Sequence, residues 1–180
     1  MEIISSKDNK KIKEARKLLT KKYRKNSYLI EGFHLLEEAL KAGRSIKQIF
    51  VEENKLTKLT EMIGSEKLLT DLSVNLVSKE VLKSLADSES PQGLIAEVTK
   101  IEEVIDYSAA KFLLLENVQD PGNVGTMIRT ADAAGFSAVI LLGETADIYS
   151  PKVMRSMQGS NFHLPLVRMS KEDCFDQLKK

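Results

Sequence analysis

Apolar residues follow two alternating patterns along the chain. Short apolar runs are typical of strands, and apolar positions three and four residues apart are typical of helices. The predicted strands cover residues 27–31, 46–51, 74–77, 93–98, 111–115, 137–142 and 164–167. The predicted helices run from a cap at Ser6 or Asp8 to about residue 24, over 32–42, 55–63, 78–86 and 123–134, from 151 onward, and from 170 to the end. This alternation indicates an α/β layer fold.

Residues 99–110 interrupt the alternation, because they carry several acids and no strong pattern. We therefore predict a first domain over residues 1–98, a linker over 99–110 and a second domain over 111–180. The run Phe112–Leu115 is expected to be a parallel strand buried on both faces. Residues 112–142 then form a βαβ unit with a right-handed crossover. Its helix is predicted to be capped by Asn123 and to place Met127 in the core.

Charge is distributed unevenly along the sequence. The chain has 27 basic and 26 acidic residues, a net charge of +1, but residues 1–30 hold ten basic and three acidic groups. That segment carries +7 and the remainder −6. A concentrated basic end favours a polyanionic partner, while a lysine-rich solvated helix remains the alternative. A membrane-surface helix ranks below both, because its apolar face lacks large aromatic residues.

Composition excludes several classes of protein. An apolar content of 42% and a charged content of 29% are ordinary for globular proteins, which excludes wholesale disorder. No apolar run is long enough to span a bilayer, and the first residues do not resemble a secretory signal. The single cysteine, Cys174, excludes an intramolecular disulfide and a multi-cysteine metal site, and the two histidines leave few options for a histidine-based one. We expect a cytoplasmic protein with no metal and no membrane association.

Candidate chemistry begins in the loop that follows the strand at 111–115. Residues 116–125 are rich in polar side chains and glycine, and the helix behind them could receive a phosphate. An ordinary loop and helix cap would explain the same residues. The loop lacks the G-x-G-x-x-G fingerprint, and the chain has no phosphate-binding Gly-Lys-Ser/Thr loop. A nucleotide-dependent enzyme of the doubly wound type is therefore the weakest hypothesis.

Arg129 is the most informative candidate. It is predicted to share with Gly125 and Asp132 a helix face opposite the core, where it could reach a phosphate or carboxylate. A surface ion pair with Asp132 is the alternative. A second polar cluster, residues 150–163, fits contacts to a nucleic-acid backbone or a plain helix and loop. We interpret His163 as structural, with a general base as the alternative.

Two segments resemble a known enzyme family. ENVQDPGNVGTMIRTADAAGF (116–136) resembles the first signature of the SpoU/TrmH-type RNA ribose 2′-O-methyltransferases, of the SPOUT class. SPKVMRSMQGSNFHLPL (150–166) is similar to the second signature, and residues 1–98 are similar to the N-terminal RNA-binding domain of many members. The resemblance implies a small ribosomal-protein-like α/β domain followed by a trefoil-knotted α/β domain. It also implies S-adenosylmethionine as methyl donor and a homodimer whose active site uses both subunits.

The resemblance also implies roles for individual residues. Asn123 and Arg129 match the family's active-site asparagine and arginine. Glu116 and Asn117 match the loop that borders the site, and Gly159 falls in the second signature. Together with the basic start, the residues expected to contact RNA are Lys10, Lys11, Arg16, Lys21, Lys22, Arg24, Glu116, Asn117, Lys152, Arg155 and Ser156.

One departure from the family pattern concerns the end of the chain. Members carry a third signature, with a Gly-x-Glu-x-x-Gly loop, that holds most cofactor contacts and makes the knot, and this sequence stops at Lys180 before it. The resemblance therefore predicts a truncated form and leaves the cofactor-binding residues unknown. The predicted function is S-adenosylmethionine-dependent methylation of RNA, with ribosomal RNA ranked above transfer RNA. A non-catalytic RNA-binding module is the alternative, and poor donor binding by this chain would favour it.

Overall fold

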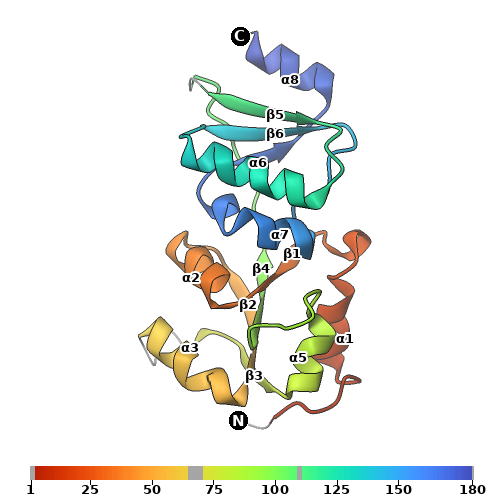
Figure 1. The fold of residues 1–180 in the computed structure, drawn as a ribbon, viewed down its shortest axis with the longest axis vertical. Coiled ribbons are helices and arrows are strands. Elements are labelled where there is room, and N and C mark those ends of the chain that lie inside the picture. Colours follow the sequence, from red (N-terminus) through yellow and green to blue (C-terminus); the bar gives the residue numbers. More distant parts are fainter. Residues whose placement is uncertain (1–2, 65–70, 109–110, 180) are drawn as a thin grey trace. The chain divides into compact units, whose positions relative to one another are not determined.

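A computed structural model describes residues 3–64, 71–108 and 111–179, and Figure 1 shows its fold. The chain divides into two compact units, Met1–Lys100 and Ile101–Lys180, each built from a sheet with helices against it. The division falls within the predicted linker, whose residues 109 and 110 lie outside the described part. The α/β fold predicted from the sequence is confirmed.

The first unit contains a four-stranded mixed sheet in the order β1-β4-β2-β3. The strand β4 runs antiparallel to β1 and β2, whereas β3 runs parallel to β2. The strands are β1 (Ser27–Glu31), β2 (Ile46–Glu52), β3 (Val74–Val77) and β4 (Leu94–Thr99). The helices are α1 (Lys10–Lys17), η1 (Lys21–Tyr23), α2 (Phe33–Lys41), η2 (Glu53–Lys55), α3 (Leu56–Ile63) and α5 (Lys79–Leu85).

The core of this unit forms where α1 and α5 cover one face of the sheet. Ile12 and Ala15 of α1 and Leu82 of α5 pack with Phe50 and Ile95, and all five side chains are buried. These residues lie on one face because α1 places apolar residues three apart, and strand residues alternate between faces. Figure 1 shows α2 and α3 on the other side of the sheet.

The basic N-terminal helix is shorter than predicted and begins at a different cap. Asn9 is the N-cap, because its Oδ1 accepts from Lys11 N at 2.9 Å, and α1 ends at Lys17 rather than near residue 24. A longer helix would pair the Leu18 carbonyl with the amide four residues later. That carbonyl instead accepts from Arg24 Nη1 at 2.8 Å, and the following residues turn as the 3₁₀ helix η1.

The second unit is built on a three-stranded parallel sheet in the order β5-β6-β7. Its strands are β5 (Phe112–Glu116), β6 (Ala138–Leu142) and β7 (Leu166–Arg168). Its helices are α6 (Pro121–Ala133), α7 (Pro151–Met157), η3 (Ser160–Phe162) and α8 (Lys171–Leu178). Figure 1 shows α6 and α8 on opposite sides of this sheet.

Burial differs sharply between the strands of this sheet. Every residue of β6 is buried, as its apolar run predicts. The prediction that β5 is buried on both faces was wrong, since Phe112, Leu113 and Leu114 are only half-buried. The reason is that β5 has a neighbour on one side alone among the described strands. No helix in the described part of the chain is long and apolar enough to cross a membrane.

Candidate functional site

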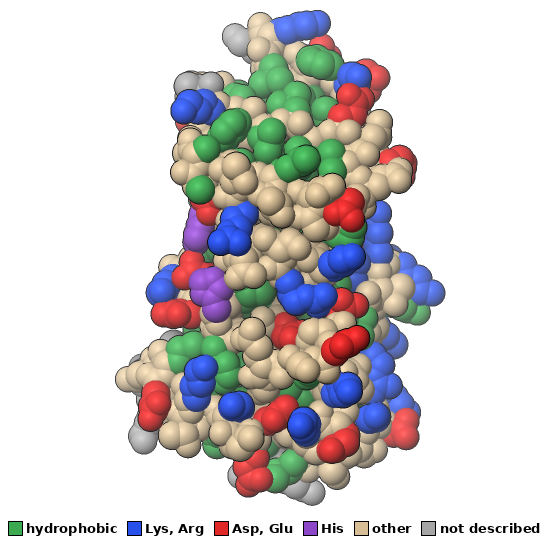
Figure 2. Space-filling view, in the orientation of Figure 1, with side chains coloured by type: hydrophobic (Ala, Val, Ile, Leu, Met, Phe, Trp, Pro, Cys, Tyr) green, Lys and Arg blue, Asp and Glu red, His purple; other side chains and the backbone are tan. Residues whose placement is uncertain are grey.

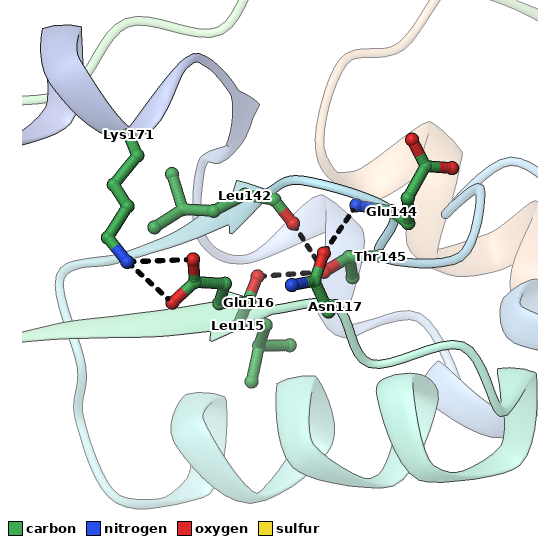
Figure 3. A network of polar contacts seen from close by, with 7 residues as sticks. All are labelled: Leu115, Glu116, Asn117, Leu142, Glu144, Thr145 and Lys171. Carbon is green, nitrogen blue, oxygen red and sulfur yellow. Dashed lines mark hydrogen bonds and ion pairs between the residues drawn. The ribbon is translucent and has the colours of Figure 1, made fainter.

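The carboxyl ends of β5, β6 and β7 meet at one edge of the parallel sheet, where ligands of such folds are usually bound. The loops after β5 and β6 are held together there by the buried side chain of Thr145 (Figure 3). Thr145 Oγ1 lies 2.8 Å from both Leu115 O and Leu142 O, and Val118 N donates to it at 3.3 Å. One hydroxyl therefore ties the ends of two neighbouring strands to the first loop.

Asn117, in the loop after β5, also binds the loop after β6. Its backbone is in the left-handed region, with φ of 57°, a conformation that asparagine tolerates better than most residues. Its Oδ1 accepts from Glu144 N at 2.9 Å and sits where a side chain on Gly143 would have to go. The predicted RNA contact Asn117 thus has a structural task, and its side chain already has a partner.

The side chain of Arg168, at the end of β7, binds backbone carbonyls of the loop after β6. Its Nη1 donates to Gly143 O at 2.9 Å, and its Nη2 donates to Thr145 O at 2.5 Å and Ala146 O at 3.1 Å. Sequence reasoning missed both Arg168 and Thr145. The signal that could have indicated Arg168 is its position as a charged last residue of a parallel strand, because the loops that bind ligands follow the carboxyl ends of such strands.

Glu116 also has a partner in the structure. Its carboxylate accepts from Lys171 Nζ at 2.9 and 3.2 Å (Figure 3). This hydrogen bond is the main reason that the pKa of Lys171 is raised. Both side chains are about half exposed, so the pair contributes little to stability. Glu116 therefore connects the end of β5 to the start of α8.

The helix that follows the first loop begins three residues before the predicted one. Asp120 is the N-cap, since its Oδ1 accepts from Asn123 N at 2.7 Å, and Pro121 occupies the first helical position. Proline is well suited there because its missing N–H would have no partner in the helix. The prediction that Asn123 caps the helix was wrong, and its side chain is exposed and available for other contacts.

Arg129 lies further along α6, on an exposed part of its surface. Within the described residues its guanidinium has no hydrogen-bond or ion-pair partner, and the alternative pair with Asp132 is not formed. Arg129 comes six positions after Asn123, which corresponds to about 9 Å along the helix axis. A free guanidinium can bind phosphate through two parallel hydrogen bonds, and an amide can bind a hydroxyl.

The prediction that Gly125, Arg129 and Asp132 share a face of α6 opposite the core was wrong for Gly125, because α6 contacts α7 there. Gly125 is buried, and a Cβ there would overlap Ser156 and lie 3.0 Å from Met157 N. Asp132 Oδ2 lies 2.7 Å from His163 Nδ1. Met127, which was predicted to be in the core, is 40% exposed. The structure therefore brings the two signature segments together through glycine and through an acid–histidine contact.

The remaining predicted contact residues are placed less uniformly. Lys152 is exposed, Arg155 is half-buried, and Ser156 Oγ donates to Lys152 O at 3.0 Å. In the first unit Lys10, Lys21 and Lys22 are exposed.

Three of the predicted cations in the first unit have structural partners. Lys11 donates to Asn75 and Arg16 to Ser84. Arg24 is 6% exposed and donates to the Leu18 carbonyl, so its burial gives no support to a contact with RNA. In the described part of the chain, no three His, Cys, Asp or Glu residues gather as metal ligands would.

Comparisons of the sequence with known proteins identify relatives of both units. Residues 9–96 match the MRM3-like substrate binding domain and residues 110–180 match the SpoU rRNA methylase family. The chain is 44% identical over 181 residues to the 23S rRNA (guanosine(2553)-2'-O)-methyltransferase RlmP of Bacillus subtilis (strain 168), covering 99% of this chain and 70% of that relative. It is 33% identical over 147 residues to the mitochondrial rRNA methyltransferase 3 of Homo sapiens, covering 77% of this chain and 34% of that protein.

A solved structure extends the likeness to three dimensions. The AdoMet-bound rRNA methyltransferase from Sinorhizobium meliloti superposes with a TM-score of 0.84 at 29% identity, covering 99% of this chain and 68% of that one. The similarity to rRNA methyltransferases in sequence and in fold thus covers nearly the whole chain. The chain belongs to the SpoU rRNA methylase family.

Proposed function

We propose that this protein transfers a methyl group from S-adenosylmethionine to a ribose 2′-oxygen of ribosomal RNA. The observation that carries the proposal is the 44% identity, over 99% of the chain, to a relative named as a 23S rRNA 2'-O-methyltransferase. The exposed guanidinium of Arg129, which has no partner among the described residues and lies in the segment that resembles the family's first signature, is the structural feature that fits it. A ribosomal substrate is consistent with a cytoplasmic location.

Arg129 has a task suited to its chemistry. Because the pKa of arginine lies above 12, it is a poor general base at neutral pH. We infer that its guanidinium orients a phosphate of the RNA and stabilises the negative charge that develops on the ribose oxygen. Asn123 is exposed six residues earlier on α6, and we infer that its amide binds a hydroxyl of the same nucleotide.

The methyl donor supplies an already activated methyl group, so the protein has to align the reactants and handle one proton. The side chains of Asn117 and Thr145 are bound to backbone groups at the ends of β5 and β6 and in the loop after β6, and Arg168 donates to three backbone carbonyls of that loop. We therefore assign no donor-contacting residue to this chain. The proposal that S-adenosylmethionine is the donor is supported by the relatives, including an AdoMet-bound structure.

A homodimer is the assembly that we propose. Apart from Arg129, the exposed residues of α6 and of its C-cap are uncharged, although 29% of the chain is charged. They are Asn123, Thr126, Met127, Thr130, Ala133 and Ala134. Sedimentation is expected to give twice the mass of one chain, and Met127→Glu is expected to shift the protein toward monomer because it places a charge in the contact. An unchanged monomeric mass for the wild type would contradict the dimer.

The function is tested by incubating the purified protein with tritiated S-adenosylmethionine and ribosomal RNA that lacks ribose methylation. The expected product is a 2′-O-methylated nucleoside, identified by mass spectrometry after digestion. Label on a base instead of the ribose would contradict the proposed reaction. Binding of the RNA without transfer, under conditions in which the donor binds, would favour a non-catalytic RNA-binding module.

A further inference from the structure

The first unit contains a hollow of about 710 Å³ at the outer edge of β3. It is lined by Ile3, Ile4, Ser5, Ser6, Asn9, Lys10, Lys11, Val74, Asn75 and Leu76. The N-terminal segment closes it on one side, since Ile4 N donates to Leu76 O and Ser78 N donates to Ile4 O. We propose that this hollow binds one unstacked nucleotide of single-stranded RNA, which rests on the proposed function and names a place where the RNA is held.

The lining suits a ligand with an apolar face and a negative charge. Ile3, Ile4 and Leu76 provide apolar surface, and Lys10 and Lys11 provide two positive charges. None of the ten lining residues is acidic. A nucleotide combines a flat base that can lie on an apolar surface with a phosphate that lysines attract.

Lys11 is held in place before any ligand arrives. Its Nζ lies 2.7 Å from Asn75 Oδ1, and Asn75 is 7% exposed. The amide nitrogen of Asn75 donates to Ile49 O at 3.3 Å and Ser73 O at 3.2 Å, so the side chain is anchored to the sheet. An ammonium group has three donors, and two of them remain for a phosphate. A positioned charge loses less entropy on binding than a mobile one.

Lys10 and Lys11 lie where positive charges do not stabilise α1. The first turn of this helix holds Lys10, Lys11 and Lys13 and no acid, although cations are unfavourable at the positive end of a helix dipole. Lys13 is paired with Asp8 at 2.9 Å. In the described part of the chain, Lys10 and Lys11 have no acidic partner. A phosphate bound in the hollow would supply one.

Binding at this place is expected to be insensitive to base identity. Both amide hydrogens of Asn75 and the amide oxygen of Asn9 are used within the protein, which limits the two side-chain amides of the wall as readers of base edges. The remaining lysines and serine hydroxyls suit phosphate and sugar, contacts that position RNA without reading its sequence. The ligand must be single-stranded, because a base stacked in a duplex cannot enter a hollow. Figure 2 shows further basic side chains gathered along one side of the first unit, on which α1 lies. We expect the RNA beyond the bound nucleotide to continue along this side.

The test compares two pairs of lysines on one helix. A fluorescein-labelled oligouridylate of about twelve nucleotides, long enough to span one such site, is titrated with the full chain at several salt concentrations. Lys10→Gln with Lys11→Gln is expected to weaken binding roughly tenfold or more and to reduce the log–log salt slope by about 0.7 for each phosphate that is no longer neutralised. Lys13→Gln with Lys17→Gln removes the same charge outside the hollow, where both lysines are paired with acids. Equal weakening in the two double variants would overturn the proposal.

Two further measurements test binding in the hollow without changing the charge of the protein. Ser5→Trp fills the hollow without changing the charge, and it is expected to weaken binding in a protein whose thermal unfolding is unchanged. Ultraviolet crosslinking of a 4-thiouridine oligonucleotide is expected to label peptides containing residues 3–11 or 73–76. Crosslinks confined to other peptides, or equal competition by an RNA duplex, would overturn the proposal.

The outcome separates this site from the proposed function. A protein that methylates ribosomal RNA normally while both lysine pairs behave alike would overturn the hollow as a binding site and leave the enzyme assignment intact. A protein that binds the oligonucleotide through Lys10 and Lys11 but transfers no methyl group would support the hollow and contradict the enzyme assignment.

Discussion

At the scale of single residues, Arg129 and Cys174 of the second unit are placed in opposite ways. Arg129 is exposed on α6 and has no partner within the described residues, which fits a group that waits for a substrate phosphate. Cys174 is fully buried on α8 against Ile105, Ala138 and Ile140, and that burial raises the pKa of its thiol. A protonated, inaccessible thiol is a packing residue and a poor nucleophile.

The raised pKa of Cys174 predicts a loss of stability in alkali. The unfolded thiol ionises at a lower pH than the folded one, so protons leave the unfolded chain first and rising pH favours unfolding. The contribution is fully present below the ordinary pKa of a thiol and is lost as pH rises through the higher folded value. Urea unfolding at neutral pH and at about pH 9.5 measures the difference. Cys174→Ala should remove this part of the pH dependence, and an identical pH dependence in both proteins would refute the assignment.

At the scale of elements, the second unit depends on the close crossing of α6 and α7. Gly125 permits this crossing, because any side chain there would overlap Ser156. The contact joins the two segments that resemble the family signatures, and Asp132 with His163 extends it to η3. The spacing of the signature glycine is therefore a packing requirement, and the exposed position of Arg129 depends on that packing.

Gly125→Ala is expected to destabilise the second unit by about 1–3 kcal/mol, the usual cost of overpacking a well-filled contact. Thermal unfolding should show a lower midpoint for this variant. Gly122→Ala, on the same helix, is the matched control, since its Cβ would approach only Asp120 Oδ1, at 3.1 Å. Equal midpoints for the two variants would mean that the helix crossing does not require glycine.

Arg168 carries a prediction for the loop after β6. Replacing it with alanine leaves the carbonyls of Gly143, Thr145 and Ala146 without their donor. Hydrogen exchange at the amides of residues 143–147 is expected to accelerate markedly, because the loop opens more often. Arg168→Lys should rescue this only in part, since one ammonium cannot match the spread of a guanidinium. Unchanged exchange in the alanine variant would show that Thr145 and Asn117 hold the loop alone.

Helix caps are the features of this chain that local sequence controls most directly. Ser78, Ser150 and Ser170 cap the helices that the sequence predicts after them, because a cap depends on neighbouring residues. The cap of α6 was misplaced, since Asp120, Pro121 and Asn123 all favour a helix start and the sequence does not rank them.

Tertiary contacts decided the features that the sequence did not predict. Exposure of Met127 and the half-burial of β5 depend on which neighbours cover each surface. Local periodicity does not report those neighbours. The clamp made by Arg168 joins residues more than twenty positions apart and leaves no local pattern.

At the scale of the whole molecule, charge and chemistry are assigned to different parts of the chain. Residues 1–30 carry a charge of +7, and their lysines line the hollow and the exposed surface of α1. The second unit carries the loops at the carboxyl edge of its parallel sheet and the exposed guanidinium of Arg129. This division suits an enzyme that holds RNA by its phosphates with one unit and modifies a ribose with the other.

The most direct test of the proposed activity is a map of ribose methylation in ribosomal RNA from cells that lack the gene for this protein. Resistance of the 2′-O-methylated linkage to alkaline hydrolysis locates each modified nucleotide. We expect one ribose methylation to disappear, to return with the wild-type gene, and to stay absent with Arg129→Ala although that variant is folded and present at normal levels. An unchanged methylation map, or full restoration by Arg129→Ala, would contradict the proposed activity.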